Sequence, residues 1–475
     1  MRVTQKSRHF SNTAIIITTA LATQLRGIMG TRGATTIPSS LETRLQNQLE
    51  QRIQISSNRS LDLPDSKNTI DFSSNDYLGL AHSTAQHEKV QSKYKDYTAT
   101  HLPPYLGSTG SRLLSGNSAL ALQLEKFLAK VHNRPAALVC NSGYDANLSV
   151  LSSIPLPNDI IILDELVHNS LIMGVKMSRI PLNRVHYFRH NDVRDLERIL
   201  SSVKKTLEPE QSILVVVESV YSMDGDISPL RDILDLALDF NASVVVDEAH
   251  GLGVFGHTNA HDTTLSQHKH ENRTHNSNTC GGTGVLAALN LENHPALLAT
   301  VYTFGKAAGC HGAVITGSKI LIDYLVNYAR PFIYSTSLPL HSLWAIKCAY
   351  DTMIGKEGED LREKVFHLVK IFRSRLLEEL QKDDEFLLPS PSPIQAVLCR
   401  GNETCIEMAN KLRKIGHVAV YPIRSPTVPK GEERIRIIIH AHNTEQEVLH
   451  LVECLLCFAK NNSQGMEADK LMSKL

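Results

Sequence analysis

The apolar positions between residues 117 and 256 predict alternating strands and helices. Short runs of branched apolar residues lie at 136–140, 160–163, 213–217 and 244–246. Such runs are typical of strands buried on both faces of a sheet, because no alternate position needs to face water. The segments between them carry apolar residues at helical spacing. This order predicts an α/β fold in which a mostly parallel sheet lies between layers of helices.

The pattern changes in the last third of the chain. A long helical stretch from about 340 to 380 precedes strand-like segments at 396–400, 418–422 and 433–440, with a helix near 406–416 between them. We expect this part to form a smaller α+β domain.

Apolar residues at every fourth position predict a helix at the start of the folded body: Leu41, Leu45, Leu49 and Ile53. The predicted organisation is therefore a leader (1–40), an N-terminal segment (41–100), a large domain (101–338), a small domain (339–460) and a polar tail (461–475).

A polar insertion with almost no apolar periodicity interrupts the large domain at 257–280. It contains five histidines, but a zinc site needs ligands at matched spacing, which the insertion lacks. We predict a solvated surface loop and no bound metal.

Charge and composition narrow the classes of partner. The 475 residues contain 49 basic and 49 acidic side chains, so no net field attracts nucleic acid or an acidic membrane surface. The apolar stretch 14–21 is shorter than the ~20 residues of a membrane helix. The eight cysteines are scattered, which indicates thiols, and Cys454 and Cys457 fit the core of a helix better than a metal site.

Two opposing signals concern the location of the protein. The leader is basic, rich in Ser and Thr, and has no acidic residue before Glu42, a composition typical of transit peptides. The last three residues, 473–475, read Ser-Lys-Leu, which is a peroxisomal address. We expect a peroxisomal protein bound by the peroxisomal import receptor, with the mitochondrion and the cytosol as alternatives.

Candidate chemistry lies at the ends of the predicted strands, where open α/β sheets place their ligands. After strand 136–140 the chain turns through Gly143 into a helix that begins near Tyr144, and such a helix start can bind phosphate. A plain strand-to-helix turn explains these residues equally well. Asp247 directly follows three valines, and a carboxylate there needs a partner. A protonated pyridine nitrogen would be one, and backbone amides would be another.

Four further residues extend this set. Lys306 lies among small residues in TFGKAAG, which leaves space for a flat ring, and Thr303 is placed to hold a phosphate oxygen. His168 follows another buried strand and either lies flat on such a ring or is a core histidine. His250 is close enough to Asp247 in sequence to reach the phenolic oxygen of the same ring.

Seven segments together resemble the α-oxoamine synthases, enzymes that use pyridoxal 5'-phosphate (PLP). They are FSSNDYLGL (72–80), GSTGSRLLSG (107–116), NSGYDAN (141–147), SVYSMDGDISPL (219–230), DEAHGLGVFG (247–256), TFGKAAGCHGA (303–313) and YSTSLP (334–339). The resemblance covers roughly residues 41–455 and implies the fold type I, aspartate aminotransferase-like PLP-dependent transferase fold. It also implies a homodimer with a shared active site.

The resemblance assigns a role to each candidate residue. Lys306 would be the Schiff-base lysine, Asp247 would hold the pyridine nitrogen, and His168 would stack on the ring. The remaining contacts would come from His250 and Ser222 at the phenolic oxygen, from Gly143, Tyr144 and Thr303 at the phosphate, from Ser335 and Thr336 at the partner's phosphate, and from Asn75 and Arg436 at the carboxylate of the amino acid. Arg434 shares the predicted strand face of Arg436, so the pattern does not separate the two.

The implied activity is the decarboxylative condensation of an amino acid with an acyl-CoA. The sequence is most similar to the branch that joins L-alanine to pimeloyl-CoA in biotin synthesis. Members that use other amino acids or acyl chains remain alternatives, and so does a catalytically silent scaffold subunit. The insertion at 257–280 and the leader depart from the family pattern, but neither removes a candidate residue.

Overall fold

The computed structural model describes residues 40–59, 61, 69–100, 106–256, 281–380 and 386–464. The leader, the insertion at 257–280 and the terminal tripeptide lie outside the described residues, so the expectations for them stay predictions. One helix, α2 (Ser40–Gln54), belongs to a separate first unit of the chain. It forms where the fourfold spacing predicts it, and none of its side chains is buried.

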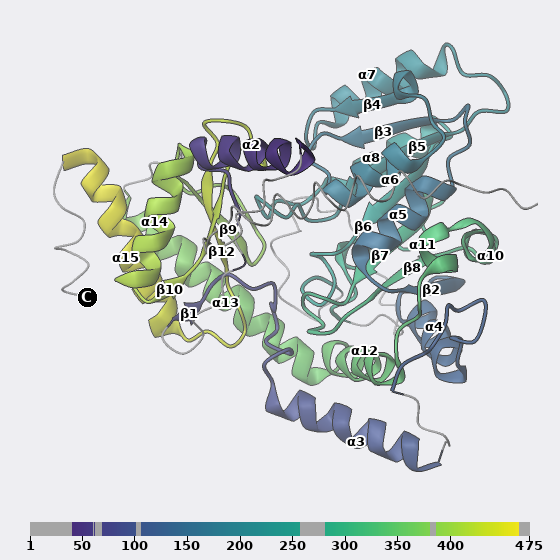
Figure 1. Ribbon diagram of the computed structural model, residues 1–475, viewed down its shortest axis with the longest axis horizontal. Coiled ribbons are helices and arrows are strands. Elements are labelled where there is room, and N and C mark those ends of the chain that lie inside the picture. The colour runs from purple at the N-terminus through teal and green to yellow at the C-terminus, as the bar shows by residue number, and fades with distance from the viewer. Residues whose placement is uncertain are drawn as a thin grey trace, which may run out of the picture. The chain divides into compact units, whose positions relative to one another are not determined.

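A seven-stranded sheet forms the centre of the large domain (Figure 1). Its order is β2-β8-β7-β6-β5-β3-β4, and only β8 runs antiparallel to its neighbours. The bounds are β2 (Ala136–Cys140), β3 (Ile160–Asp164), β4 (Val185–Phe188), β5 (Ile213–Glu218), β6 (Ser243–Asp247), β7 (Leu297–Thr303) and β8 (Ala313–Gly317). The predicted mostly parallel α/β sheet is confirmed.

Helices cover both faces of this sheet (Figure 1), which explains the uninterrupted apolar runs. Alternate residues of one strand enter different cores: Val215 and Val217 join one, and Leu214 and Val216 join the other. The first core also contains α4 (Ala119–Val131), α7 (Val193–Lys204), α8 (Leu230–Asp239) and α12 (Leu340–Met353). The second contains α5 (Gly143–Ser153), α6 (Asn169–Met177), α10 (Lys319–Tyr328) and α11 (Arg330–Tyr334).

The small domain is built on an antiparallel sheet of order β11-β12-β9, made from β9 (Ile394–Leu398), β11 (Tyr421–Ile423) and β12 (Arg434–Ile438). Its core also includes residues of α13 (Lys356–Glu379), α14 (Asn402–Lys414) and α15 (Glu445–Gln464). The short strands β1 (Ile70–Asp71) and β10 (Val418–Ala419) pair in parallel, so residues near the start of the second unit complete this domain.

One predicted element needs correction. The helical stretch 340–380 is broken, because α12 ends at Met353 and α13 begins at Lys356 after an extended Gly355. The helix α12 packs in the core of the large sheet, and Val365 is the first α13 residue buried in the second core, while the predicted domain bounds stay a prediction. The remaining segments of regular structure are α3 (Thr84–Thr100), α9 (Val285–Ala288) and the 3-10 turn η1 (Leu182–Arg184).

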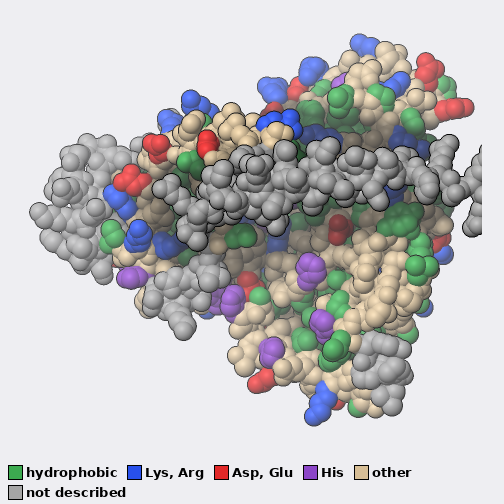
Figure 2. Space-filling model, in the orientation of Figure 1, with side chains coloured by type: hydrophobic (Ala, Val, Ile, Leu, Met, Phe, Trp, Pro, Cys, Tyr) green, Lys and Arg blue, Asp and Glu red, His purple; other side chains and the backbone are tan. Residues whose placement is uncertain are grey.

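The surface carries charged side chains of both signs, in line with the equal numbers of acidic and basic residues. Acidic and basic side chains are mixed over the face drawn in Figure 2. Among the described residues, no helix combines the length and apolar character needed to cross a membrane. The described cysteines form no disulfide, and Cys454 and Cys457 are buried in α15.

Candidate active site

The predicted residues gather at the carboxyl ends of the parallel strands. His168 follows β3, Glu218 ends β5, Asp247 ends β6 and Thr303 ends β7, with Lys306 three residues further along. Because these strand ends meet at one edge of the sheet, residues more than a hundred positions apart become neighbours.

A chain of three side chains begins at the predicted Schiff-base lysine. Nζ of Lys306 lies 2.6 Å from Nε2 of His250, and Nδ1 of His250 lies 2.5 Å from the hydroxyl of Tyr77. Burial lowers the pKa of Lys306 to about 8, although the carboxylates of Asp247 and Glu218 act in the opposite direction. Burial also lowers the pKa of His250 well below its ordinary value. A neutral imidazole therefore faces the amine.

Asp247 is a buried carboxylate with unused capacity to accept hydrogen bonds. Its Oδ1 accepts the backbone N–H of Ala249 at 2.9 Å, and its Oδ2 accepts the side-chain amide of Asn147 at 2.7 Å. Asp247 forms no ion pair with a side chain in the described part of the protein. An ionised carboxylate has about four acceptor positions, so a cationic N–H donor can still bind. Backbone amides were the alternative partner of Asp247 in the sequence analysis. One of them, the N–H of Ala249, does bind it, but it occupies only Oδ1.

His168 is the N-cap residue of α6, and its backbone and ring are both fixed. Its backbone N–H donates to Oε1 of the buried Glu218, and its Nδ1 lies 2.7 Å from the hydroxyl of Ser170. The side chain is nevertheless exposed. A core histidine is thus ruled out, and the exposed ring is available for stacking, which stays a prediction.

The turn predicted to bind phosphate, at residues 141–144, lies against the end of β7. Ser142 caps α5 by accepting the N–H of Asp145 at 3.0 Å, which leaves the N–H groups of Gly143 and Tyr144 at the first turn of the helix. A Cβ on Gly143 would lie only 3.0 Å from Oγ1 of Thr303. The structure therefore brings the predicted phosphate ligands together, and it explains why glycine occupies position 143.

The segment 335–337 lies beside this turn. The side-chain amide of Asn141 donates to the carbonyl of Thr336 at 2.8 Å. Ser335 is half-buried and the side chain of Thr336 is exposed. Their contact with a partner's phosphate stays a prediction.

Arg436 on β12 is buried and has an unusual set of partners. Its Nε donates to the carbonyl of Ser222 at 2.6 Å, and its Nη2 donates to Oδ1 of Asn75 at 3.0 Å. Tyr77 adds a hydrogen bond. None of these partners is a carboxylate, so the guanidinium can still pair with one. Ser222 touches Arg436 through its backbone, and the predicted role of its hydroxyl stays a prediction.

Arg434 lies on the same face of β12, but it does have carboxylate partners. It forms ion pairs with Asp224 and Glu432, and it is also buried. The structure thereby separates two arginines that the strand pattern leaves equivalent, because only Arg436 lacks a carboxylate partner among the described residues.

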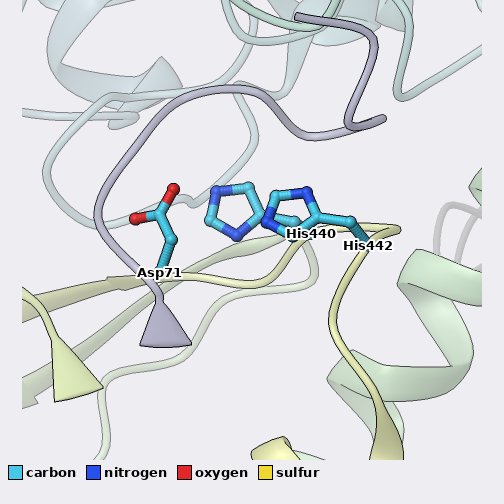
Figure 3. Close-up of side chains that lie close together, drawn as sticks. All are labelled: Asp71, His440 and His442. Carbon is cyan, nitrogen blue, oxygen red and sulfur yellow. The ribbon is translucent and has the colours of Figure 1, made fainter. Parts of the chain in front are cut away.

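Figure 3 shows one group of potential metal ligands beside this region: Asp71, His440 and His442. The rings of His440 and His442 are stacked, with centroids 4.5 Å apart and planes 15° apart. Lone pairs of stacked rings lie in parallel planes and cannot both point at one ion. Nε2 of His440 also lies 2.9 Å from the carbonyl of Ser74. This geometry does not support a metal site.

A family model for aminotransferase class I and II matches residues 67–455, which include every residue of the site. The chain belongs to this family. Its members use PLP.

Similar proteins place the chain among the α-oxoamine synthases of this family. It is 35% identical over 441 residues to 8-amino-7-oxononanoate synthase of Emericella nidulans, covering 91% of this chain and 98% of the relative. It is 35% identical to the putative 8-amino-7-oxononanoate synthase of Glaesserella parasuis, covering 81% and 90%.

Solved structures confirm the fold. Serine palmitoyltransferase of S. paucimobilis aligns with a TM-score of 0.72 at 23% identity, over 90% of this chain and 100% of that one. The 8-amino-7-oxononanoate synthase of Francisella tularensis aligns with a TM-score of 0.63 at 23% identity, over 84% and 100%. The predicted PLP-dependent, aspartate aminotransferase-like fold is confirmed.

Sequence reasoning missed three side chains of this α-oxoamine synthase site. Tyr77 and Asn147 lie inside segments that carry the resemblance, but no spacing rule connects them to His250 or Asp247. Glu218 ends β5 just as Asp247 ends β6, and the two are paired in register. The sequence signal that could have identified Glu218 is the same as for Asp247: an acidic residue directly after a run of valines.

Proposed function

We propose that this α-oxoamine synthase condenses L-alanine with pimeloyl-CoA to give 8-amino-7-oxononanoate, CoA and CO2, a reaction of biotin synthesis. The supporting observation is the arrangement of Lys306, whose lowered pKa suits a base, near a buried arginine without a carboxylate partner. The choice of substrates is supported by the 35% identity to the Emericella nidulans enzyme over nearly its whole length.

The residues of the site fit PLP at three points. Gly143 lies at the first turn of α5 close to Thr303, where a helix N-terminus offers backbone N–H groups to a phosphate. Asp247 offers a buried negative charge with acceptor positions to spare. Lys306 offers an amine that is easily deprotonated. When bound, PLP supplies an electron sink for the α-carbon of an amino acid.

The protein supplies binding and proton transfer. Arg436, held by Asn75 and Ser222, binds the carboxylate of alanine and fixes the α-carbon relative to Lys306. Nζ of Lys306 takes the proton from that carbon, because a pKa of about 8 leaves part of the amine unprotonated near neutral pH. Asp247 would hold the pyridine nitrogen of bound PLP.

The bond changes balance with one proton taken up from water, because one proton leaves the α-carbon and two are added in the steps that follow. A bond forms between the α-carbon of alanine and the thioester carbon, the carbon–sulfur bond breaks and CoA leaves as a thiolate that takes up a proton. The bond from the α-carbon to the carboxylate then breaks and releases CO2, and a proton returns to the α-carbon. His168 polarises the reacting carbonyl in this proposal.

The direct test of the substrates is a CoA-release assay over a matrix of amino acids and acyl-CoAs. We expect the highest kcat/KM for L-alanine with pimeloyl-CoA. Turnover of serine with a long-chain acyl-CoA, without turnover of the proposed pair, would instead indicate an activity like that of serine palmitoyltransferase. A silent scaffold would release no CoA with any pair.

We also propose a homodimer that shares the active site. Exposed apolar side chains lie on the two segments 106–114 and 334–337, among them Leu106 and Leu114 at 81% and 83% exposure and Tyr334 at 80%. Their segments are joined, because Ser108 donates to the carbonyl of Ser337 at 2.7 Å. A second copy would cover these side chains and bring its own Thr336 close to the phosphate.

Sedimentation velocity of Leu114→Asp tests the dimer. We expect a monomer that has lost PLP affinity, whereas Leu238→Asp, a matched change at an exposed position of α8, should stay dimeric. A Leu114→Asp protein that remains dimeric with normal PLP binding would contradict this interface.

A further inference from the structure

The loop at residues 219–228 connects the large domain to the substrate arginine. It follows β5, and its tip lies against the small domain at three points. The carbonyl of Ser222 accepts Nε of Arg436 at 2.6 Å, Asp224 pairs with Arg434, and the carbonyl of Gly225 accepts the hydroxyl of Ser390 at 3.0 Å. The position of this loop therefore helps to determine where the guanidinium of Arg436 lies.

The base of the loop is fixed by a histidine that plays no part in the proposed chemistry. Nδ1 of His190 lies 2.9 Å from Oδ1 of Asp164, and its Nε2 lies 2.7 Å from Oδ2 of Asp226. Asp164 ends β3 and is fully buried, whereas Asp226 belongs to the loop. Asn191 adds two bonds, since its amide donates to Asp226 at 2.6 Å and its carbonyl accepts the hydroxyl of Ser228 at 2.9 Å.

His190 needs both ring protons to hold this geometry. Each ring nitrogen faces a carboxylate, so each donates a proton and the ring is an imidazolium. Burial lowers the pKa of His190, but the bonds and charges of Asp164 and Asp226 outweigh it and raise the pKa to about 10. The other facing groups are Tyr221, whose ring meets the imidazole edge-on, and Glu165, which accepts the backbone N–H of His190. The imidazolium therefore persists throughout the neutral range.

We propose that His190 is a positioning residue for the carboxylate of the amino-acid substrate. It joins the buried end of β3 to the 219–228 loop, and the loop in turn holds Arg436 through the carbonyl of Ser222. Without the imidazolium, Asp164 and Asp226 would repel each other and the loop would leave its place. This inference rests on the proposed role of Arg436, and it does not depend on the identity of the acyl-CoA.

The test compares two ligands that differ only at the carboxylate. The PLP-loaded His190→Gln protein is titrated with L-alanine and with L-alaninamide, and the absorbance of the cofactor reports binding. We expect the Kd for alanine to rise about tenfold, equivalent to ~1.4 kcal/mol. The Kd for alaninamide, which has no carboxylate, should change less than about twofold. His186→Gln on β4 is the matched control, and it should bind both ligands as the wild type does.

A double variant distinguishes positioning from general damage. If His190 acts through Arg436, the protein with both His190→Gln and Arg436→Lys should bind alanine no more weakly than Arg436→Lys alone. Equal weakening for both ligands, or fully additive effects, would overturn the proposal. If His190→Gln fails to fold, Asp226→Asn weakens the same link to the loop while keeping the Asp164–His190 pair, and it should show the same selectivity. An Arg436→Lys protein that binds alanine normally would refute the proposed substrate site instead.

Discussion

Nζ of Lys306 lies 2.6 Å from Nε2 of His250. Burial lowers the pKa of both groups, that of Lys306 to about 8, so a fraction of the amine is unprotonated near neutral pH. In that form the amine can react as a nucleophile and later act as a base, as an α-oxoamine synthase requires.

Lys306→Met should still bind PLP but lose the covalent link to the protein. Borohydride reduction followed by peptide mass spectrometry should find the cofactor on Lys306 in the wild type and on no lysine in the variant. Turnover should fall by about 10⁴-fold, because the substitution removes the amine proposed to take the proton. A reducible adduct on a different lysine would disprove the assignment.

The same substitution should stabilise the PLP-free protein at neutral pH. The pKa of Lys306 is about 8 in the folded protein and 10.5 in an unperturbed chain, so between these values the unfolded chain binds more protons and stability rises with pH. Below pH 8 the buried amine opposes folding most strongly. We expect Lys306→Met to have a higher Tm than the wild type at pH 7, with the difference narrowing toward pH 10.5. A difference independent of pH would argue against the lowered pKa.

Tyr77→Phe should impair catalysis more than stability. Arg436 donates to the oxygen of Tyr77, so we infer that the hydroxyl proton points at Nδ1 of His250 and that Nε2 carries the ring proton toward Nζ of Lys306. Losing this bond should reduce kcat about tenfold, or ~1.4 kcal/mol. Tyr350→Phe provides the control, because it removes a buried Tyr–His bond of 2.8 Å to His132 outside the site. Equal kcat in the two variants would show that Tyr77 only packs.

Gly143→Ala should weaken PLP binding. The added Cβ would lie 3.0 Å from Oγ1 and 3.1 Å from Cβ of Thr303, so the Thr303 side chain or the turn proposed to bind phosphate must shift by a few tenths of an ångström. We expect the Kd for PLP, measured by fluorescence titration, to rise about tenfold. Gly107→Ala adds a Cβ with nothing within 4 Å and should leave the Kd unchanged. Normal PLP binding by Gly143→Ala would place the phosphate elsewhere.

Arg436→Lys should raise the KM for alanine markedly, because a point charge replaces a guanidinium that can bind a carboxylate with two bonds. Arg434→Lys should raise that KM much less and lower the Tm, since Arg434 already pairs with Asp224 and can reach the substrate site only through the 219–228 loop. Steady-state kinetics of both variants decide between them. The opposite pattern would exchange their roles.

The sequence predicted the fold well where burial leaves a strong pattern. The valine runs of β5 and β6 are enclosed on both faces, and they appear as uninterrupted apolar segments. The strands β4 and β7 were not predicted. β4 lies at the edge of the sheet with only Phe188 buried, and β7 contains Thr300 and Thr303 among its apolar residues. Edge position and interior threonines weaken the apolar signal on which the prediction depends.

The site was predictable only in part. Family segments pointed to Lys306, Asp247 and His250, and the fold brings them together. Arg434 and Arg436 could be distinguished only from the structure, because the distinction depends on Asp224, which lies 210 positions away from Arg434. The roles of Tyr77 and His190 likewise arise from contacts between distant segments. Pairing across such distances leaves no local spacing to read.

The most direct measurement of the central claim follows the carbon atoms of the reaction. The PLP-loaded protein is supplied with alanine labelled with carbon-13 at the carboxylate and with pimeloyl-CoA, and the products are quantified by mass spectrometry. The account predicts labelled CO2, free CoA and unlabelled 8-amino-7-oxononanoate in equal amounts, and none of them from the Lys306→Met protein. Retention of the label in the product, or formation of a different amino ketone from another substrate pair alone, would contradict it.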